Sequence, residues 1–550
     1  MAPLPETTAQ AAAEDGGGDT SKALGDAWDY RGRPAVRASS GGWSSAAMIL
    51  GVELNERLTT LGIAVNLVTY LTAAMHLGNA ASANAVTNFL GTSFLLCLLG
   101  GFVADTYLGR YLTIAISTAV QAAGMAVLTV STAAPGLRPA PCEDPTGDGR
   151  RAARRALPGP LPDGAGDRRA QVERVGVRDN VGRRWGYGAC VVAILGVFLA
   201  GTPRYRFKKL AGSPLTQIAA VTAAAWRKRA LPLPSDPAML YDLDDAAAAG
   251  EDVKGKRKLP HSKQCRFLDQ AAIVEVELEP SSGKKKKWAV CTVTEVEEVK
   301  QVVRMLPTWA TTIIFWTVYA QMTTFSVSQA QSLDRRLGPS FVIPAGSLTV
   351  FFVGSILLTV PIYDRLIAPL ARRLTGNPQG LSPLQRIFVG LFLSILAMVV
   401  AGLTERHRLS ASTAGVQLSV FLIVPQFLLV GAGEAFTYIG QLDFFLCECP
   451  RDMKTMSTGL FLTTLSLGFF LSSGLVSIVH AVTTSDGRRP WLANDIDKGR
   501  LDYFYWLLAA ISTANLGIFT AAAKGYVYKE KRLADAGFIE LHVEEVVVHA

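Results

Sequence analysis

The residues of this chain best suited to chemistry are three charged side chains inside an apolar segment. Glu53, Glu56 and Arg57 lie within residues 51–66, and spacings of three and four place them on one face of a helix. Each charge costs about 2.5–3.5 kcal/mol at the centre of a bilayer, so this face must look into a protein or water-filled interior. Ionisable residues in such positions commonly serve proton or ion pathways. The alternative is a structural ion pair that joins two helices.

The composition is that of a protein that crosses a membrane several times. Of its 550 residues, 49% are hydrophobic, and the mean hydropathy is +0.27. The net charge of +9 comes from Lys and Arg clustered between apolar segments, which is typical of cytoplasmic loops rather than of nucleic-acid binding. Residues 1–42 do not resemble a signal peptide, and the seven Cys show neither metal-ligand spacing nor a disulfide framework.

Ten apolar segments predict membrane spans and an all-α fold. They cover residues 44–76, 83–102, 111–133, 187–201, 304–329, 343–368, 385–404, 415–446, 455–480 and 502–524. The resulting organisation is a cytosolic tail (1–42, with 1–26 disordered), an N-terminal transmembrane half (43–203), a cytosolic linker (204–300), a C-terminal transmembrane half (301–528) and a cytosolic tail (529–550). Within the basic linker, 215–229 is either an amphipathic helix along the membrane surface or a solvated charged segment.

Several motifs resemble those of one transporter family. Asp105, Gly109 and Arg110 resemble the cytoplasmic loop signature of the major facilitator superfamily, and Glu53-x-x-Glu56-Arg57 resembles the motif of its proton-coupled peptide and nitrate branch. Further matches are Lys258-Leu-Pro-His261, Phe267 to Ile273, Val293 to Lys300, Arg304 to Trp309, Gln441 to Phe445 and Met456 to Gly459. The chain is identified as a member of the plant nitrate transporter/peptide transporter family, most similar to its dual-affinity nitrate-transporting type.

The resemblance fails over residues 143–178. The family has twelve spans, whereas ten are visible here, and the missing fourth and fifth are replaced by a Pro-, Gly- and Arg-rich segment. Such a composition cannot supply an apolar span. Codons for 157–178, read one base later, can encode a string that resembles the family's fourth span. A frame-shifted segment is therefore our hypothesis, and sequencing the transcript tests it.

The resemblance also implies roles for individual residues. Glu53 and Glu56 take up protons beside the permanently charged Arg57. Tyr319 and Thr323, one helical turn apart, bind substrate. Apolar residues of the family's pocket correspond to Leu61, Val65, Leu90 and Phe469. Tyr319 stands where nitrate-transporting members have a His, and a neutral donor favours chloride over nitrate. The alternative is that Tyr319 only packs among neighbouring aromatic residues.

Two further positions follow from the same comparison. Glu434 belongs to the substrate site and, in the family, pairs with a Lys of the fourth span. This chain lacks that Lys, so Glu434 is expected to be protonated or destabilising. Thr113, three residues after Arg110, matches a position that is phosphorylated to switch affinity.

These features predict a proton-coupled transporter of nitrate and/or chloride that works by alternating access. The alternatives are a symporter of di- or tripeptides or another small solute and, from another class, a nitrate sensor or a non-functional truncated product. We expect no enzyme activity and no cofactor. The expected partners are protons, a small inorganic anion, membrane lipid and a kinase acting on Thr113, with a homodimer compatible with the family. The expected location is the plasma membrane.

Overall fold

The computed structural model describes residues 23–36, 40–73, 77–133, 192–208, 214–234, 239–242, 258–274, 290–338, 341–375, 380–450, 453–485, 490–493, 496–529 and 531–532. The chain forms two compact units, Met1–Ile63 with Val103–Ala211 (unit 1) and Ala64–Phe102 with Gly212–Ala550 (unit 2). The anomalous segment 143–178 lies outside the described residues, as does the 533–550 part of the C-terminal tail.

Unit 1 holds the first part of α2 (Gly42–Ala73), a π-helical turn (Ala104–Leu108), α4 (Arg110–Ala133), a helix at 192–200 and a 3₁₀ turn (Thr202–Arg204). Aromatic packing joins its later segments. The rings of Tyr111 and Phe198 stack with centroids 5.3 Å apart, and Tyr205 lies 5.2 Å from Phe198. The Tyr111 hydroxyl is 2.7 Å from Thr202 Oγ1. The span predicted at 187–201 therefore corresponds to a packed helix.

A small antiparallel sheet also belongs to unit 1. It contains β1 (Ala23–Trp28), β2 (Pro34–Val36) and β3 (Phe207–Lys208), in the order β2-β1-β3. The prediction that 1–26 is disordered is therefore wrong for 23–26. Its partner strand β3 lies about 180 residues away, which local composition cannot reveal.

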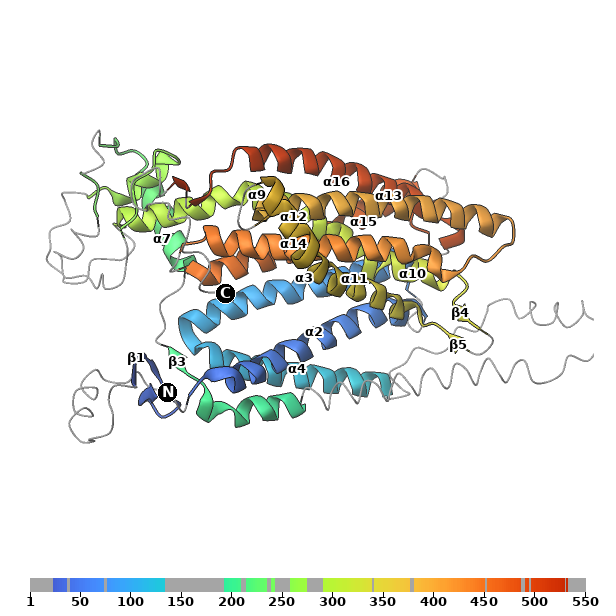
Figure 1. The fold of residues 1–550 in the computed structure, drawn as a ribbon, viewed down its shortest axis with the longest axis horizontal. Helices are drawn as coiled ribbons and strands as arrows, with labels where there is room; N and C mark the ends of the chain where they lie inside the picture. Colours follow the sequence, from blue (N-terminus) through green and yellow to red (C-terminus); the bar gives the residue numbers. More distant parts are fainter. Residues whose placement is uncertain are drawn as a thin grey trace, which may run out of the picture. The chain divides into compact units, whose positions relative to one another are not determined.

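Unit 2 is a helical bundle. After α3 (Asn79–Val103) and the linker, its helices are α9 (Val293–Thr323), α10 (Phe325–Gln331), α11 (Thr349–Ile362), α12 (Ala368–Thr375), α13 (Pro383–Thr413), α14 (Val424–Glu448), α15 (Lys454–Ser485) and α16 (Leu501–Lys524). Short connecting elements are β4 (Arg336–Leu337), β5 (Phe341–Val342), 3₁₀ turns at Ala345–Leu348, Val420–Ile423 and Ile496–Lys498, and a π turn at Tyr363–Ile367. Helix α13 packs on α14 and α16, α9 on α15, and α11 on α14 (Figure 1).

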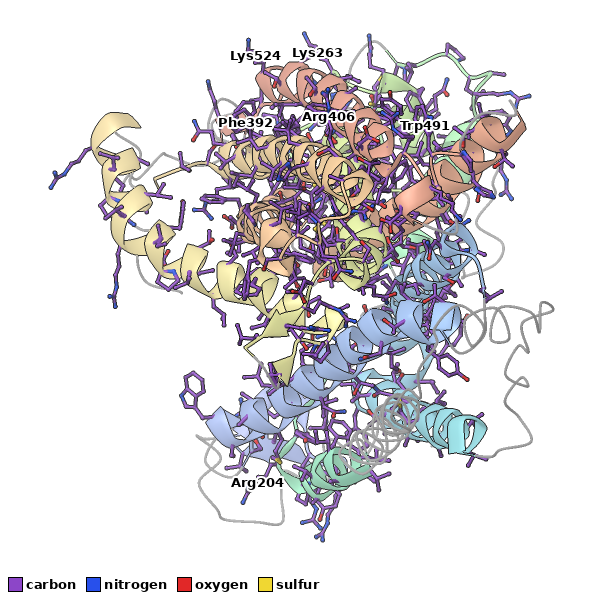
Figure 2. All side chains as sticks on the ribbon, turned by 90° about the vertical axis from the view of Figure 1, so that its right-hand side faces the viewer. Arg204, Lys263, Phe392, Arg406, Trp491 and Lys524 are labelled. Atoms are coloured by element: carbon purple, nitrogen blue, oxygen red, sulfur yellow. The ribbon has the colours of Figure 1, made fainter. Side chains whose placement is uncertain are left out.

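Close packing in this bundle depends on small residues where helices meet. A Cβ on Gly390 of α13 would lie 1.9 Å from Thr437 Oγ1 and 2.7 Å from the Gly433 carbonyl oxygen of α14. Only glycine permits that approach. Figure 2 shows how densely the side chains of this unit are crowded among its helices.

Each of the ten predicted spans contains a helix of the structure. Among the described residues, six helices are long and apolar enough to cross a membrane: Asn79–Leu108, Ala345–Arg373, Pro383–Thr413, Val420–Glu448, Met456–Thr484 and Leu501–Lys524. Several boundaries differ from prediction, and those of the span predicted at 304–329 illustrate the difference. Helix α9 begins at Val293 rather than 304, because Thr292 and Glu295 form a capping box, and it ends at Thr323 instead of continuing to 329.

The linker carries a folded subdomain. Helix α7 (Pro214–Arg227) and the 3₁₀ helix η6 (Arg266–Ala272) pack against the first turns of α9. Val221 and Ala224 of α7 are buried with Leu268 and Val296 in one apolar cluster. Of the two alternatives for 215–229, the structure has a helix, but its buried apolar residues pack against protein instead of lying along a membrane surface.

Candidate functional site

The charged stretch of the first span lies on an unbroken helix, α2. Glu53 is exposed and Glu56 half-buried, and Glu56 Oε1 accepts a hydrogen bond of 3.0 Å from Thr60. Asn55 and Thr59, on the neighbouring face, are buried. The Arg57 side chain lies outside the described residues, so the ion pair expected there remains a prediction.

A cluster of aromatic residues surrounds Tyr319 of α9. Its ring meets Trp316, Phe352 and Phe469 edge-on, with centroids 5.4, 5.5 and 6.1 Å away. Such tilted arrangements are the favoured geometry of aromatic pairs. Leu90, from α3, is buried in the same apolar cluster as Phe469. The structure therefore brings together Tyr319, Leu90 and Phe469, three residues that the sequence assigned to one pocket.

Two other pocket residues predicted from the sequence, Leu61 and Val65, lie on α2, and their side chains are outside the described residues. Both fall in the helical part of the backbone. Their contribution to the pocket stays a prediction.

A break in the helix follows directly after Thr323. Thr324 has φ −118° and ψ −90°, which ends α9, and α10 starts at Phe325. The hydroxyls of Thr323 and Thr324 both donate to the Ala320 carbonyl oxygen, at 3.0 and 2.9 Å. Discontinuous helices of this kind form substrate and ion sites in many transporters. The sequence predicted one continuous span here, because Thr and Ser give no strong breaking signal.

Glu434 of α14 is half-buried beside Gly433. The expectation that Glu434 is protonated or destabilising stays a prediction.

The loop signature forms a compact turn in unit 1. Gly109 adopts φ +75°, a left-handed conformation that favours glycine. Arg110 Nε lies 3.5 Å from Asp105 Oδ1, with Arg110 largely exposed. The Thr113 hydroxyl donates to the Gly109 carbonyl oxygen at 3.0 Å. The residues matched to this motif therefore contact one another.

A buried ionic network in the linker subdomain was missed by sequence reasoning. Lys300 Nζ lies 2.7 Å from Asp269 Oδ1 and 2.7 Å from Glu297 Oε1, and His261 Nε2 lies 3.1 Å from Asp269 Oδ2. Ser262 donates its N–H and hydroxyl to Glu297. The signal was present, because each residue falls in a motif already matched to the family, but spacing alone does not bring three motifs together.

The same group could be taken for a metal site, since ligand atoms of His261, Asp269 and Glu297 lie within 4.8 Å of one another. The Lys300 ammonium occupies the position between the two carboxylates. Arg304 supplies a second cation, with Nη2 3.9 Å from Glu297 Oε2. The arrangement is thus a charge-balanced structural network rather than an open metal site.

Fold and site together define a class: a multi-pass helical membrane protein with ionisable residues on a membrane helix and a discontinuous helix beside an aromatic cluster. The chain belongs to the POT family, whose model PTR2 matches residues 172–492. It is similar to Protein NRT1/PTR FAMILY 6.3 of Arabidopsis thaliana, with 53% identity over 94% of this chain and 97% of the relative. Protein NRT1/PTR FAMILY 6.2 of the same organism is 48% identical over 91% and 94%.

Solved structures agree on the fold. An auto-inhibited POT family peptide transporter gives a TM-score of 0.57 at 18% identity, covering 88% of this chain and 98% of that one. The POT family transporter PepTSo gives 0.55 at 16%, covering 88% and 99%. The family resemblance noted from the motifs is confirmed, and the protein is a multi-pass membrane transporter of this family.

Proposed function

We propose that this protein carries a small inorganic anion, chloride and/or nitrate, across the plasma membrane together with protons. The observation that carries the proposal is the environment of Tyr319. Its phenol is surrounded by Trp316, Phe352 and Phe469, so the polar group that it adds to this cluster is one neutral hydroxyl. A small spherical anion requires little directional recognition, whereas a peptide needs groups for both of its termini.

Proton coupling is assigned to Glu53 and Glu56, with Arg57 as the fixed positive charge. Protonation of a carboxylate weakens its attraction to a guanidinium. A proton taken up at Glu56 would therefore loosen pairing with Arg57 and release the helix for its movement in the cycle. Support comes from the placement of all three on one continuous membrane helix.

The experiment is a comparison of currents in oocytes that express the full chain. We expect inward currents with chloride or nitrate that are several-fold larger at pH 5.5 than at pH 7.5, and no current with a dipeptide. The variant Glu56→Gln should lose the pH dependence while reaching the same surface abundance.

Three outcomes would contradict the proposal. Currents with a dipeptide instead of the anions would indicate a peptide symporter. Saturable anion binding without current would indicate a sensor. Normal surface abundance with neither binding nor current would indicate a non-functional product, and a frame-repaired chain measured in parallel would show whether residues 150–178 are the cause.

A further inference from the structure

The orientation of unit 2 follows from its charges. Helix α16 ends at Lys524 and is followed by Lys529 and Arg532, so this end faces the cytosol by the positive-inside rule. The segment that precedes α16, described at 490–493 and 496–500, is therefore external. Several polar contacts lie near that end of the bundle, and the mechanism above uses none of them.

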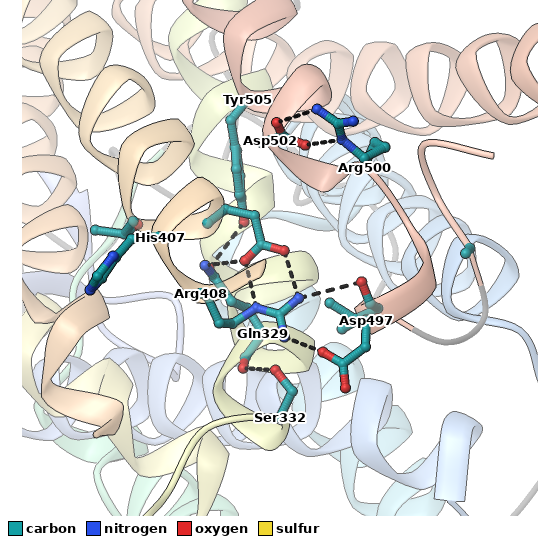
Figure 3. Close-up of polar contacts among 12 residues, drawn as sticks. Gln329, Ser332, His407, Arg408, Asp497, Arg500, Asp502 and Tyr505 are labelled. Atoms are coloured by element: carbon teal, nitrogen blue, oxygen red, sulfur yellow. Dashed lines mark hydrogen bonds and ion pairs between the residues drawn. The ribbon is translucent and has the colours of Figure 1, made fainter. Parts of the chain in front are cut away.

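The centre of these contacts is an ion pair buried in α13. Arg408 donates from Nε and Nη2 to the two oxygens of Glu405, at 2.8 Å each (Figure 3). Glu405 is fully buried and Arg408 nearly so. Paired, fork-like geometry of this kind is the strongest form of the Arg–carboxylate contact, so the pair is a rigid anchor.

The anchor holds α10, the short helix that follows the break at Thr324. Gln329 of α10 donates from Nε2 to Glu405 at 2.7 Å, and Gln426 of α14 donates to Gln329 Oε1 at 3.3 Å. Both glutamines are fully buried. The position of α10, and with it the end of the helix that carries Tyr319, depends on Glu405.

The anchor also holds the external segment. Arg408 contacts the Asp497 carboxylate and donates to the Ile496 carbonyl oxygen at 3.4 Å. This part is tied to residues 490–493 by a hydrogen bond of 3.1 Å from Arg500 N to the Trp491 carbonyl oxygen. Arg500 is itself paired with Asp502, which raises the pKa of its guanidinium.

Three hydrogen bonds near this end join α2 and α3, the helices that precede the linker, to the C-terminal half; two of them involve the held elements, α10 and the external segment, and the third involves α15. Asn79 of α3 donates to the Ala493 carbonyl oxygen at 3.3 Å, and Asn84 donates to Ser477 of α15 at 2.8 Å. Gln331 of α10 donates to Thr69 of α2 at 3.1 Å. All three join neutral groups, and such bonds are individually weak.

The contrast between the two kinds of contact carries the inference. The Glu405–Arg408 pair is charged, buried and doubly hydrogen-bonded, whereas the three hydrogen bonds to α2 and α3 near this end join neutral groups. We propose that Glu405 and Arg408 are positioning residues of the transport cycle. They hold α10 and the external segment in place, so that the weak bonds of Gln331 and Asn79, together with the bond of Asn84 to α15, close the outer side of the transporter and can reopen in each cycle.

The proposal rests on transport by alternating access but not on which anion is carried, so its test avoids substrate. Ala83 of α3 is buried in the same apolar cluster as Val476 and Val479 of α15, and Ala83→Cys places a small reporter thiol there. A membrane-impermeant methanethiosulfonate reagent is added outside to cells that express the full chain. The same chain without the reporter gives the background from native cysteines.

Loss of the hydrogen bond of Asn79 or of the ion pair of Asp497 should weaken the contacts that close the outer side, and should expose the reporter thiol at position 83. Asn79→Ala and Asp497→Asn, each combined with Ala83→Cys, are expected to raise the labelling rate at least threefold, and the double variant should add little because both act on one closure. The matched control is Thr484→Ala on α15, whose hydroxyl bonds only within its own helix, to the His480 carbonyl oxygen. It should leave the rate unchanged.

Arg408→Lys keeps the charge but loses the fork-like contact, and should also speed labelling. If Arg408→Lys does not reach the cell surface, the labelling rates of Asn79→Ala and Asp497→Asn still test the proposal. Unchanged labelling in both Asn79→Ala and Asp497→Asn would overturn the proposal, whatever the transport measurements show. A purely structural role would lower surface abundance without raising the labelling rate per surface molecule.

Discussion

Lys300 joins α9 to the linker through Asp269, with Nζ of Lys300 2.7 Å from Oδ1 of Asp269. The same ammonium contacts Glu297 one helical turn away. Lys300 is fully buried, so its charge is tolerated only because two carboxylates face it. A segment that composition alone describes as a charged linker is thereby fixed to the helix that carries Tyr319.

Lys300→Met should therefore destabilise the protein strongly. It removes the cation that the two buried carboxylates share and leaves them the longer contact of Arg304 with Glu297 and the contact of His261 with Asp269. Breaking a buried pair in this way costs about 3–5 kcal/mol. The measurement is thermal unfolding of the purified chain in detergent. The control is Lys258→Met, because Lys258 is half-exposed in its pair with Asp242 and such pairs contribute about 0–1 kcal/mol. Equal losses in the two variants would contradict the buried-network interpretation.

The two cysteines at the end of α14 should differ in reactivity. Burial raises the pKa of the Cys449 thiol to about 11, partly offset by the charge of Lys529, whereas Cys447 is exposed. At pH 8 Cys449 is below its pKa and stays protonated, and the thiolate is the reactive form. Iodoacetamide should modify Cys447 and spare Cys449, as read by mass spectrometry. Comparable modification of both in folded protein would count against this assignment.

Each span that hydropathy predicted contains a helix of the structure, but the ends of several helices differ from the predicted ends. The span predicted at 385–404 continues as α13 to Thr413, because Glu405 and Arg408 neutralise each other inside the bundle. A hydropathy scale assigns a cost to each charge separately and cannot register that pairing. For the same reason, the Lys300 network was visible only as charged residues scattered over three motifs.

The candidate site was predictable to the extent that residues share a helix or a family motif. Tyr319, Leu90 and Phe469 do meet, although they come from α9, α3 and α15. The helix break at Thr324 could not be predicted from the sequence, because no Pro or Gly stands at the break. It depends instead on tertiary contacts of α10, such as the hydrogen bond from Gln329 to Glu405.

Phosphorylation of Thr113 is predicted to change affinity for substrate. The residue lies in the first turns of α4, where a phosphate is favoured by the helix dipole and by the exposed Arg110. Because its hydroxyl now donates to the Gly109 carbonyl oxygen, modification must remove that bond. Thr113→Asp should shift KM several-fold, and Thr113→Ala should abolish the response to kinase treatment while retaining basal uptake.

The matched control for Thr113→Ala is Thr118→Ala, which changes another threonine of α4. Thr118 also donates back to its own helix, to the Ile114 carbonyl oxygen, but is buried and out of reach of a kinase. A response to kinase that persists in Thr113→Ala, or is lost in Thr118→Ala, would show that the site lies elsewhere.

Tyr319→His should change anion selectivity. A His at this position can become cationic near neutral pH, whereas the phenol cannot, so the variant gains a charged donor for a planar, multi-oxygen anion. We expect the ratio of nitrate to chloride current to rise several-fold at pH 5.5, and less at pH 7.5 because the imidazole is then mostly neutral. Tyr319→Phe separates packing from hydrogen bonding: it keeps the ring contacts with Trp316 and Phe469 and removes only the hydroxyl. If Tyr319→Phe transports both anions like the parent chain and Tyr319→His leaves the ratio unchanged, then Tyr319 is a packing residue and substrate recognition must be assigned to other groups.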